Sequence, residues 1–252
     1  IARLLQAGLS PKRIAAITFT NKAALEMRER AKSLVGPKAA KDLAISTFHS
    51  LGVRMLREDG DKLGLKAKFS ILDSDDVMGV IRDAGACTDN KLARSWQWTI
   101  SLWMKLYEER LVAYQAVDFD DLISLPLKLL TTHEEARAKW QNQFGHVLVD
   151  EYQDTNVVQY ELLKALVSHP DEHRRGLFTA VGDDDQSIYG WRGATIENLK
   201  RLPEEFPTLK VIALEQNYRS TGATLRAANM VIAGNPKNYE KKLWSDLGDG
   251  EP

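Results

Sequence analysis

The chain has 252 residues, and its 44% hydrophobic and 27% charged residues are typical of a globular protein, which excludes disordered, collagen-like and coiled-coil chains. The formal net charge of −1 excludes a partner recognised through bulk positive charge. Residues 1–38 nevertheless hold eight basic and two acidic side chains, a local charge of +6, so the remainder carries −7. The neutral total therefore conceals a basic N-terminal end and an acidic body.

The single cysteine, Cys87, rules out an internal disulfide and favours a reducing compartment. The sequence has no apolar run approaching the length of about 18 residues that a membrane span needs, and no signal-peptide pattern opens it. We therefore expect a cytoplasmic protein without a membrane partner. Because the chain begins at Ile1 without Met, in sequence that reads as the middle of a helix, we also expect a fragment.

Five short apolar runs are predicted to form strands: Ile14–Phe19, Leu43–Thr47, His146–Asp150, Leu177–Gly182 and Lys210–Leu214. They are nearly continuous in hydrophobicity, which is typical of strands covered on both faces in a parallel sheet. Helical stretches separate them, so the predicted fold class is α/β.

The hundred or so residues between the second and third runs, 50–145, contain no convincing strand and read as helical. This connection is too long for an ordinary crossover, so it predicts a helical subdomain inserted into the sheet domain. Near its end, Thr132 and Glu135 have the spacing of a capping box for a following helix.

The run VLVDEYQDTN is an apolar strand that ends in two carboxylates, Asp150 and Glu151. At the carboxyl edge of a parallel sheet, one carboxylate can hold a Mg²⁺ that bridges nucleotide phosphates, and the next can orient or deprotonate a water. The alternative is that both are ordinary acids beside a helix N-terminus, where the helix dipole favours them. Taken alone, this motif decides little.

In the run AVGDDDQSIYGWRGA, a predicted strand is again followed by polar residues: three acids and an amide, with two aromatic residues after them. Gln186 is a group that can read a terminal phosphate, while Tyr189, Trp191 and Arg192 combine stacking faces with a phosphate-binding guanidinium. The alternative is a turn followed by a core tryptophan. A calcium loop fits less well, because the acids are consecutive.

The run ITFTNKAALEMRER places Thr18, Phe19, Asn21 and Lys22 at a strand-to-helix junction in the basic region. Polar groups and exposed N–H groups at a helix start suit phosphate contacts, and a phenylalanine ring suits a base. STFHS repeats this design after the next strand, with His49 in the corresponding place. The alternative assigns Phe19 to the core and His49 to a structural role.

The run LEQNYRS places Tyr218 directly before Arg219. A tyrosine can stack on a nucleobase, and an arginine can stabilise the charge that develops on a γ-phosphate. Neither residue type is diagnostic by itself.

Six segments, in this order and spacing, together resemble the superfamily 1 DNA helicases of the UvrD/Rep/PcrA type: TFTNKAA, STFHSLG, DFDDLI, VDEYQDTN, GDDDQSIYGWRGA and LEQNYRS. The matching segments extend from Ile14 to about Trp244, and their details are most similar to the Rep branch. The resemblance implies an ATP- and Mg²⁺-dependent motor with a RecA-like P-loop fold. It also implies 3′ to 5′ movement on single-stranded DNA, action at junctions with duplex DNA and association with the bacterial nucleoid. Replication or repair proteins are open as further partners.

By position, the resemblance implies that Asp150 ligates Mg²⁺, Glu151 activates water and Gln186 senses the γ-phosphate. Arg219 is then an arginine finger, and Tyr218 stacks on adenine. The implied single-strand track consists of Phe19, Asn21, His49, Tyr189, Trp191 and Arg192, with Thr18 and Lys22 in the same segment as the first two.

The resemblance also implies a division into domains. Residues 1–49 and 125–212 would form the first motor domain, 50–124 its helical insertion, and 213–252 the start of a second motor domain. Two departures stand out: no G-x-x-x-x-G-K-[ST] loop is present, and the insertion is short around Trp103–Met104. We therefore expect the chain alone to hydrolyse ATP poorly.

Two other readings stay open at the level of sequence. One is a helicase-derived module that binds single-stranded DNA or a partner without catalysis, which a reading frame lacking the phosphate-binding loop upstream of Ile1 would favour. The other is the helicase part of a RecB- or AddA-like nuclease complex, which would carry a nuclease domain far downstream.

Overall fold

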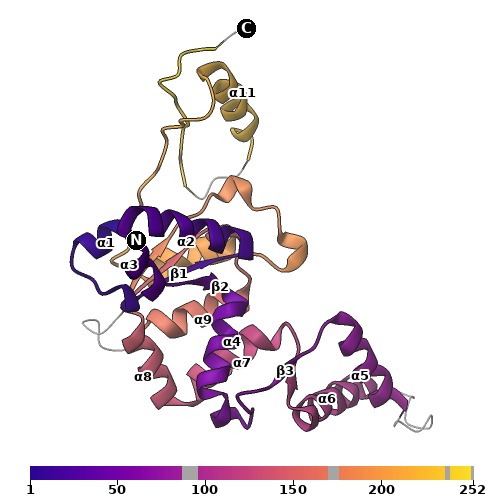
Figure 1. Ribbon diagram of the computed structural model, residues 1–252. Helices are drawn as coiled ribbons and strands as arrows, with labels where there is room; N and C mark the ends of the chain where they lie inside the picture. Colours follow the sequence, from indigo (N-terminus) through magenta and orange to yellow (C-terminus); the bar gives the residue numbers. More distant parts are fainter. Residues whose placement is uncertain (87–95, 170–175, 236–238, 251–252) are drawn as a thin grey trace. The chain divides into compact units, whose positions relative to one another are not determined.

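The computed structural model describes residues 1–86, 96–169, 176–235 and 239–250, although not the side chains of 84–86 and 96–101 (Figure 1). Cys87 lies outside the described residues. The chain forms two compact units. The first unit comprises Ile1–Asp150 and Val158–Ala180, and the second unit comprises Glu151–Val157 and Val181–Pro252.

A parallel four-stranded sheet organises the first unit, in the order β2-β1-β5-β6. Its strands are β1 (Ile14–Thr18), β2 (Ala44–Thr47), β5 (His146–Val149) and β6 (Leu177–Ala180). Four of the five predicted strands are thereby confirmed, each one or two residues shorter than expected, as is the α/β class.

Helices cover both faces of this sheet. Ile14 and Ala16 of β1 pack in one cluster with residues of α1 and α2, and the alternate residues Ala15 and Ile17 must point to the opposite face. All four are at most 1% exposed. In Figure 1, α2 and α3 lie on one side of the sheet, and α4 and α9 lie on the other. Burial on both faces explains why the strand sequence does not alternate.

The helices of the first unit are α1 (Ala2–Gln6), α2 (Asn21–Val35), α3 (Pro37–Asp42), α4 (Phe48–Asp59), α5 (Ser74–Ala86), α6 (Trp96–Tyr114), α7 (Asp121–Thr132), α8 (Glu134–Gln143) and α9 (Val157–Val167). Helix α6 is continuous across Trp103–Met104. The capping box predicted for α8 is wrong. Its N-cap is His133, because the Thr132 hydroxyl belongs to the end of α7, where it donates to the Lys128 carbonyl at 2.7 Å.

The segment predicted to lack strands does contain two very short ones. Strand β3 (Ser70–Ile71) pairs in parallel with β4 (Ala116–Val117). Two residues are too few to produce a recognisable sequence pattern, so the expectation of a purely helical segment was wrong in this detail. The rest of the described segment is mainly helical, as predicted.

The second unit contains the 3₁₀ turns η3 (Tyr152–Asp154), η5 (Asp184–Gln186) and η6 (Gly190–Arg192), with helices α10 (Glu197–Glu205) and α11 (Gly222–Ile232). The predicted strand Lys210–Leu214 is wrong: Val211 is 55% and Leu214 80% exposed, and no strand of the described residues pairs with this run. Only an isolated bridge, Gln216 to Trp244, follows it. An apolar run becomes a strand only where a neighbour completes its hydrogen bonds.

None of the helices among the described residues is both long and apolar enough to cross a membrane.

Helices α4 and α7 pack closely because Gly52 of α4 has no side chain. A Cβ at Gly52 would lie 1.7 Å from the Leu122 carbonyl oxygen. This contact fixes α4, whose first residues Phe48 and His49 follow β2 directly.

Gly52→Ala is expected to lower the free energy of unfolding by about 2 kcal/mol or more, since overpacking typically costs roughly 1–3 kcal/mol. Chemical denaturation of the 252-residue chain measures this loss. Gly79→Ala in α5 is the matched control, because a Cβ there meets no atom within 4 Å. That substitution should stabilise the helix by about 0.5–1 kcal/mol. Equal effects of the two substitutions would contradict the close approach of α4 and α7.

Candidate functional site

A helix follows each of the strands β1 and β2, and each helix has a threonine as its N-cap. Thr20 caps α2 by accepting a hydrogen bond from the Ala23 N–H at 3.1 Å, and Thr47 caps α4 by accepting one from the Ser50 N–H at 3.2 Å. The predicted strand-to-helix junctions are thereby confirmed. Asn21 and Lys22 lie exposed in the first turn of α2.

Aromatic rings line the ends of the same two strands. Phe19 is half-buried and packs edge-on against Phe48, with ring centroids 5.6 Å apart, whereas Thr18 is buried at the end of β1. The His49 ring lies 4.2 Å from the ring of Phe119, which is 60% exposed. Sequence reasoning did not select Phe119. The available signal was its position between the acids of DFDDLI.

Burial favours the uncharged form of His49. Burial lowers the pKa of its ring below the ordinary 6.5, and this effect outweighs the opposing attraction of the Asp120 carboxylate. Any contact that His49 makes with a ligand is therefore one of stacking or hydrogen bonding rather than of charge.

Asp150 and Glu151 end β5 in two different conformations. The Asp150 N–H donates to the Ile17 carbonyl at 3.0 Å and so continues the ladder beyond the strand. Glu151 then adopts a left-handed backbone conformation, with φ 51° and ψ 45°, and its side chain is exposed. Such a conformation costs a non-glycine residue roughly 1–3 kcal/mol and persists where the surrounding structure enforces it, often at functional sites.

A chain of hydrogen bonds inside the second unit links Glu151 to Gln186. The side chain of Gln153, only 1% exposed, donates to Glu151 Oε2 at 2.8 Å and accepts from the Asp183 N–H at 3.0 Å. Gln186 in turn donates to Asp183 Oδ2 at 2.6 Å. Two predicted site residues are thus joined through two that sequence reasoning did not select.

Gly182 makes this chain of hydrogen bonds sterically feasible. A Cβ at this position would lie 2.8 Å from Gln153 Oε1 and 3.3 Å from the backbone nitrogens of Tyr152 and Gln153. The glycine therefore permits the close approach of the two loops.

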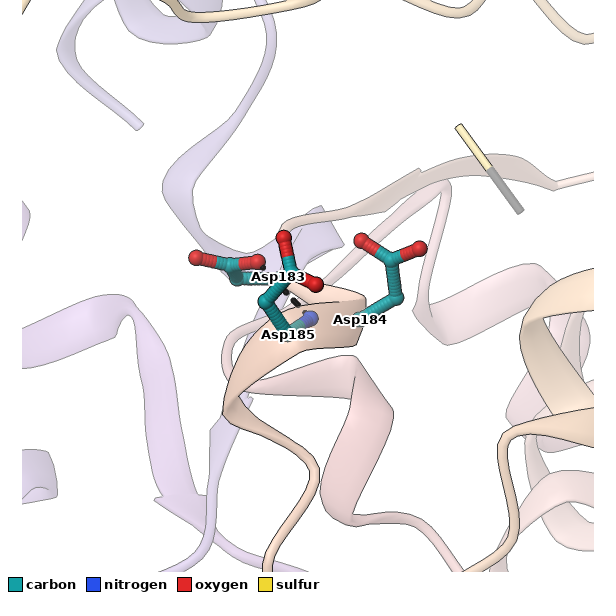
Figure 2. Close-up of side chains that lie close together, drawn as sticks. All are labelled: Asp183, Asp184 and Asp185. Atoms are coloured by element: carbon teal, nitrogen blue, oxygen red, sulfur yellow. Dashed lines mark hydrogen bonds between the residues drawn. The ribbon is translucent and has the colours of Figure 1, made fainter. Parts of the chain in front are cut away.

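Three consecutive acids, Asp183, Asp184 and Asp185, gather their carboxylates within 4.8 Å of one another (Figure 2). The Lys241 ammonium lies among them, 3.0 Å from Asp184 Oδ1 and 2.9 Å from Asp185 Oδ2, and it also pairs with Asp183. The position that a metal cation would take is therefore filled by a cation of the protein itself.

The ion pair between Asp183 and Lys241 shifts the pKa of both groups. Burial alone would raise the pKa of Asp183, but hydrogen bonds from Lys241 and Gln186 more than compensate, so the pKa lies below the ordinary 3.8. Burial alone would lower the pKa of Lys241, but its three carboxylate partners raise it above the ordinary 10.5. Both groups are therefore charged across the neutral range.

Tyr189, Trp191 and Arg192 form an exposed stacking cluster. Trp191 is 75% exposed, which contradicts the alternative that it belongs to the core. The Arg192 guanidinium lies 4.5 Å from the centre of the Trp191 ring and 5.6 Å from that of Tyr189. The cluster presents apolar rings and a positive charge together.

Tyr218 and Arg219 project from a turn built by Asn217. The Asn217 side chain accepts hydrogen bonds from the backbone N–H groups of Arg219 and Ser220, at 2.9 and 2.7 Å. Tyr218 is 78% exposed, and its hydroxyl donates to Gln216 Oε1 at 2.8 Å. The phenol ring is thus held at its hydroxyl end while its faces stay accessible.

The predicted site residues therefore fall into four groups. Within the first unit, six residues lie at or directly after the carboxyl ends of three adjacent strands: Thr18, Phe19, Asn21, Lys22, His49 and Asp150. Within the second unit, one network joins Glu151 and Gln186, one cluster holds Tyr189, Trp191 and Arg192, and one turn carries Tyr218 and Arg219.

Comparison with known proteins gives consistent matches. Residues 1–100 and 90–207 match the UvrD/REP helicase N-terminal domain. The chain is 46% identical to the ATP-dependent DNA helicase Rep of Escherichia coli (strain K12), over 99% of this chain and 41% of that protein. It is 42% identical to the ATP-dependent DNA helicase PcrA of Bacillus subtilis (strain 168), over 96% of this chain and 36% of that protein.

The chain spans about two fifths of the length of these relatives. The alignment with the Escherichia coli protein extends over 279 positions, more than the 252 residues present here, so that relative has residues without a counterpart in this chain. The two matched ranges overlap at residues 90–100, close to the place where the helical insertion was expected to be short.

Asp183→Asn is expected to lower the free energy of unfolding by about 1 kcal/mol at pH 7, the value of a partly exposed, charge-assisted hydrogen bond. Because the folded-state pKa of Asp183 is depressed, its contribution is complete above the unfolded value near 3.8 and is lost as the pH falls through the folded value. Denaturation of both proteins between pH 3 and 7 measures the difference. Asp61→Asn is the control, because the Asp61 side chain is exposed and forms no ion pair among the described residues. A difference that is the same at both ends of the pH range would contradict the pairing.

Proposed function

Because this chain belongs to the family of UvrD/REP helicase N-terminal domains, we propose that it is part of an ATP-dependent DNA helicase that moves 3′ to 5′ on single-stranded DNA. The observation that carries the proposal is the hydrogen-bonded chain from Glu151 through Gln153 and Asp183 to Gln186. It connects a carboxylate suited to activating water with an amide suited to sensing a terminal phosphate.

ATP and Mg²⁺ are the cofactors that these residues fit. Asp150 and Glu151 supply the hard carboxylate oxygens that Mg²⁺ prefers, directly after a strand of a parallel sheet. When bound to ATP, Mg²⁺ neutralises phosphate charge. In the proposal Asp150 holds the metal, and Glu151 orients the attacking water and accepts its proton.

Three further residues act on the nucleotide in this proposal. The exposed amide of Gln186 donates to the γ-phosphate, and the exposed guanidinium of Arg219 stabilises charge that develops there. The exposed ring of Tyr218 stacks on adenine, with its hydroxyl already held by Gln216.

Single-stranded DNA is the proposed substrate of the exposed aromatic residues. The Tyr189, Trp191 and Arg192 cluster offers stacking faces beside a positive charge, which suits bases and phosphates of any sequence. Phe19, Asn21 and His49 are proposed to extend the track, with Thr18 and Lys22 beside them. Phe119 joins them because its exposed ring contacts His49.

The domain division remains part of the proposal. Residues 1–49 and 125–212 would form a RecA-like motor domain, 50–124 its insertion, and 213–252 the start of a second motor domain. ATP would then bind between motor domains, whose opening and closing moves the protein along DNA. Junctions of single- and double-stranded DNA in the cytoplasm would be its place of action.

Glu151→Gln in the full-length protein should keep ATP and DNA binding but lower the DNA-stimulated ATPase rate by roughly 100-fold or more, the usual contribution of a general base. Steady-state ATPase assays and single-strand binding assays measure the two properties. Glu134→Gln is the matched control, since that side chain is 88% exposed on α8. Near-normal turnover of Glu151→Gln would refute the role assigned to Glu151.

Trp191→Ala should weaken binding of single-stranded DNA by about 1–3 kcal/mol, the value of one stacked base, with little dependence on base sequence. Fluorescence anisotropy with labelled dT and mixed-sequence oligonucleotides measures this. Trp191→Phe should retain most of the affinity because it keeps a ring, and Tyr114→Ala, in an exposed aromatic residue of α6, should have no effect. Unchanged affinity of Trp191→Ala would remove Trp191 from the proposed track.

A further inference from the structure

Lys241 is a largely buried cation to which the proposed mechanism gives no role. Its side chain is only 20% exposed, and its ammonium contacts the carboxylates of Asp183, Asp184 and Asp185. Three carboxylates within 4.8 Å of one another repel strongly unless a cation lies among them. The Lys241 ammonium therefore offsets the repulsion within the loop that carries these acids.

The consequence for the site follows from the contacts of Asp183. One carboxylate oxygen, Oδ1, accepts hydrogen bonds from Lys241 and from the Asp185 N–H, the latter at 3.1 Å. The other, Oδ2, accepts from the Gln186 amide at 2.6 Å. Holding Oδ1 fixes the plane of the carboxylate and thereby the direction in which Oδ2 meets Gln186. Lys241 thus acts on Gln186 through one intervening side chain.

Lys241 also belongs to a segment that is hydrogen-bonded to the turn carrying Tyr218 and Arg219. The Lys242 N–H donates to Glu215 Oε1 at 2.8 Å. The Trp244 N–H donates to the Glu215 carbonyl at 3.0 Å, and the Asn217 N–H donates to the Trp244 carbonyl at 2.7 Å. Asn217 in turn builds the turn of Arg219. The ammonium of Lys241 therefore ties this segment to the loop of Gln186.

We propose that Lys241 is a positioning residue for ATP hydrolysis: it orients Gln186 through Asp183 and links the Gln186 loop to the segment that carries Tyr218 and Arg219. This inference rests on the proposed function, because it assigns Lys241 to the same reaction. It differs from a purely electrostatic role, in which any means of removing the repulsion between the acids would suffice.

The test uses the full-length protein and compares Lys241→Met with wild type. Lys241→Met keeps the length of the side chain without its charge. The kcat of the DNA-stimulated ATPase should fall about tenfold, the effect of losing one hydrogen bond between charged groups, while KM for ATP stays within about twofold. Affinity for single-stranded DNA without nucleotide should not change. Lys241→Arg, which keeps a positive charge, should recover most of the turnover.

Lys242→Met is the matched control, because the neighbouring side chain is exposed and forms no ion pair among the described residues. It should leave kcat unchanged. A folded Lys241→Met protein with the kcat of the Lys242→Met protein would overturn the inference. Wild-type protein without DNA-stimulated ATPase would instead contradict the proposed function, so the two failures are distinguishable.

A second variant distinguishes an effect of Lys241 on the position of Gln186 from an effect on the stability of the fold. It also tests the inference if Lys241→Met does not fold. Lys241→Met combined with Asp184→Asn and Asp185→Asn removes the repulsion together with the ammonium, so its thermal unfolding temperature should approach that of wild type. Its kcat should stay low, because Asp183 still lacks the partner that orients it. Recovery of wild-type kcat in this variant would show that Lys241 only neutralises charge and would overturn the inference.

Discussion

The parallel pairing of β1 with β2 on one side and β5 on the other is the constraint on which the rest of the site depends. In this register Thr18 lies opposite Thr47, and Ile17 lies opposite Val149. The carboxyl ends of parallel strands lie at the same edge of a sheet, so the three segments that follow these strands, with their polar and aromatic residues, begin at that edge. All five residues of β1 are buried, so a shift of register would disturb the close packing on both faces of the sheet.

Close backbone contacts maintain the positions of these loops. The α4 helix, which carries His49 in its first turn, packs against α7 at a glycine that leaves no room for a methyl group. In the second unit, Gly182 permits a similarly close approach to Gln153, whose amide joins Glu151 to Asp183. Gly52 thereby fixes the helix that carries His49, and Gly182 leaves room for the hydrogen bonds of Gln153.

A cation within the second unit offsets part of the negative charge of its acidic loop. The three carboxylates of residues 183–185 surround the ammonium of Lys241, which comes from a position more than fifty residues later. The ammonium therefore reduces, without cancelling, the repulsion between this loop and a nucleotide bound at the site proposed above. The exposed residues suited to nucleic acid, in contrast, combine aromatic rings with Lys22 and Arg192, which form no ion pair among the residues that the structure describes.

Local sequence was enough to predict the α/β class, four of the strands and the residues that follow them. Strands buried on both faces form short, nearly continuous apolar runs, and the polar motifs follow directly in the chain. It also indicated the family, through six ordered motifs. The folded structure was needed to show that Lys210–Leu214, a run of the same kind, is not a strand. It was also needed to show that Gln153 and Asp183 join Glu151 to Gln186 and that Lys241 pairs with Asp183. Both outcomes depend on which distant segment becomes a neighbour, and a local sequence pattern does not contain that information.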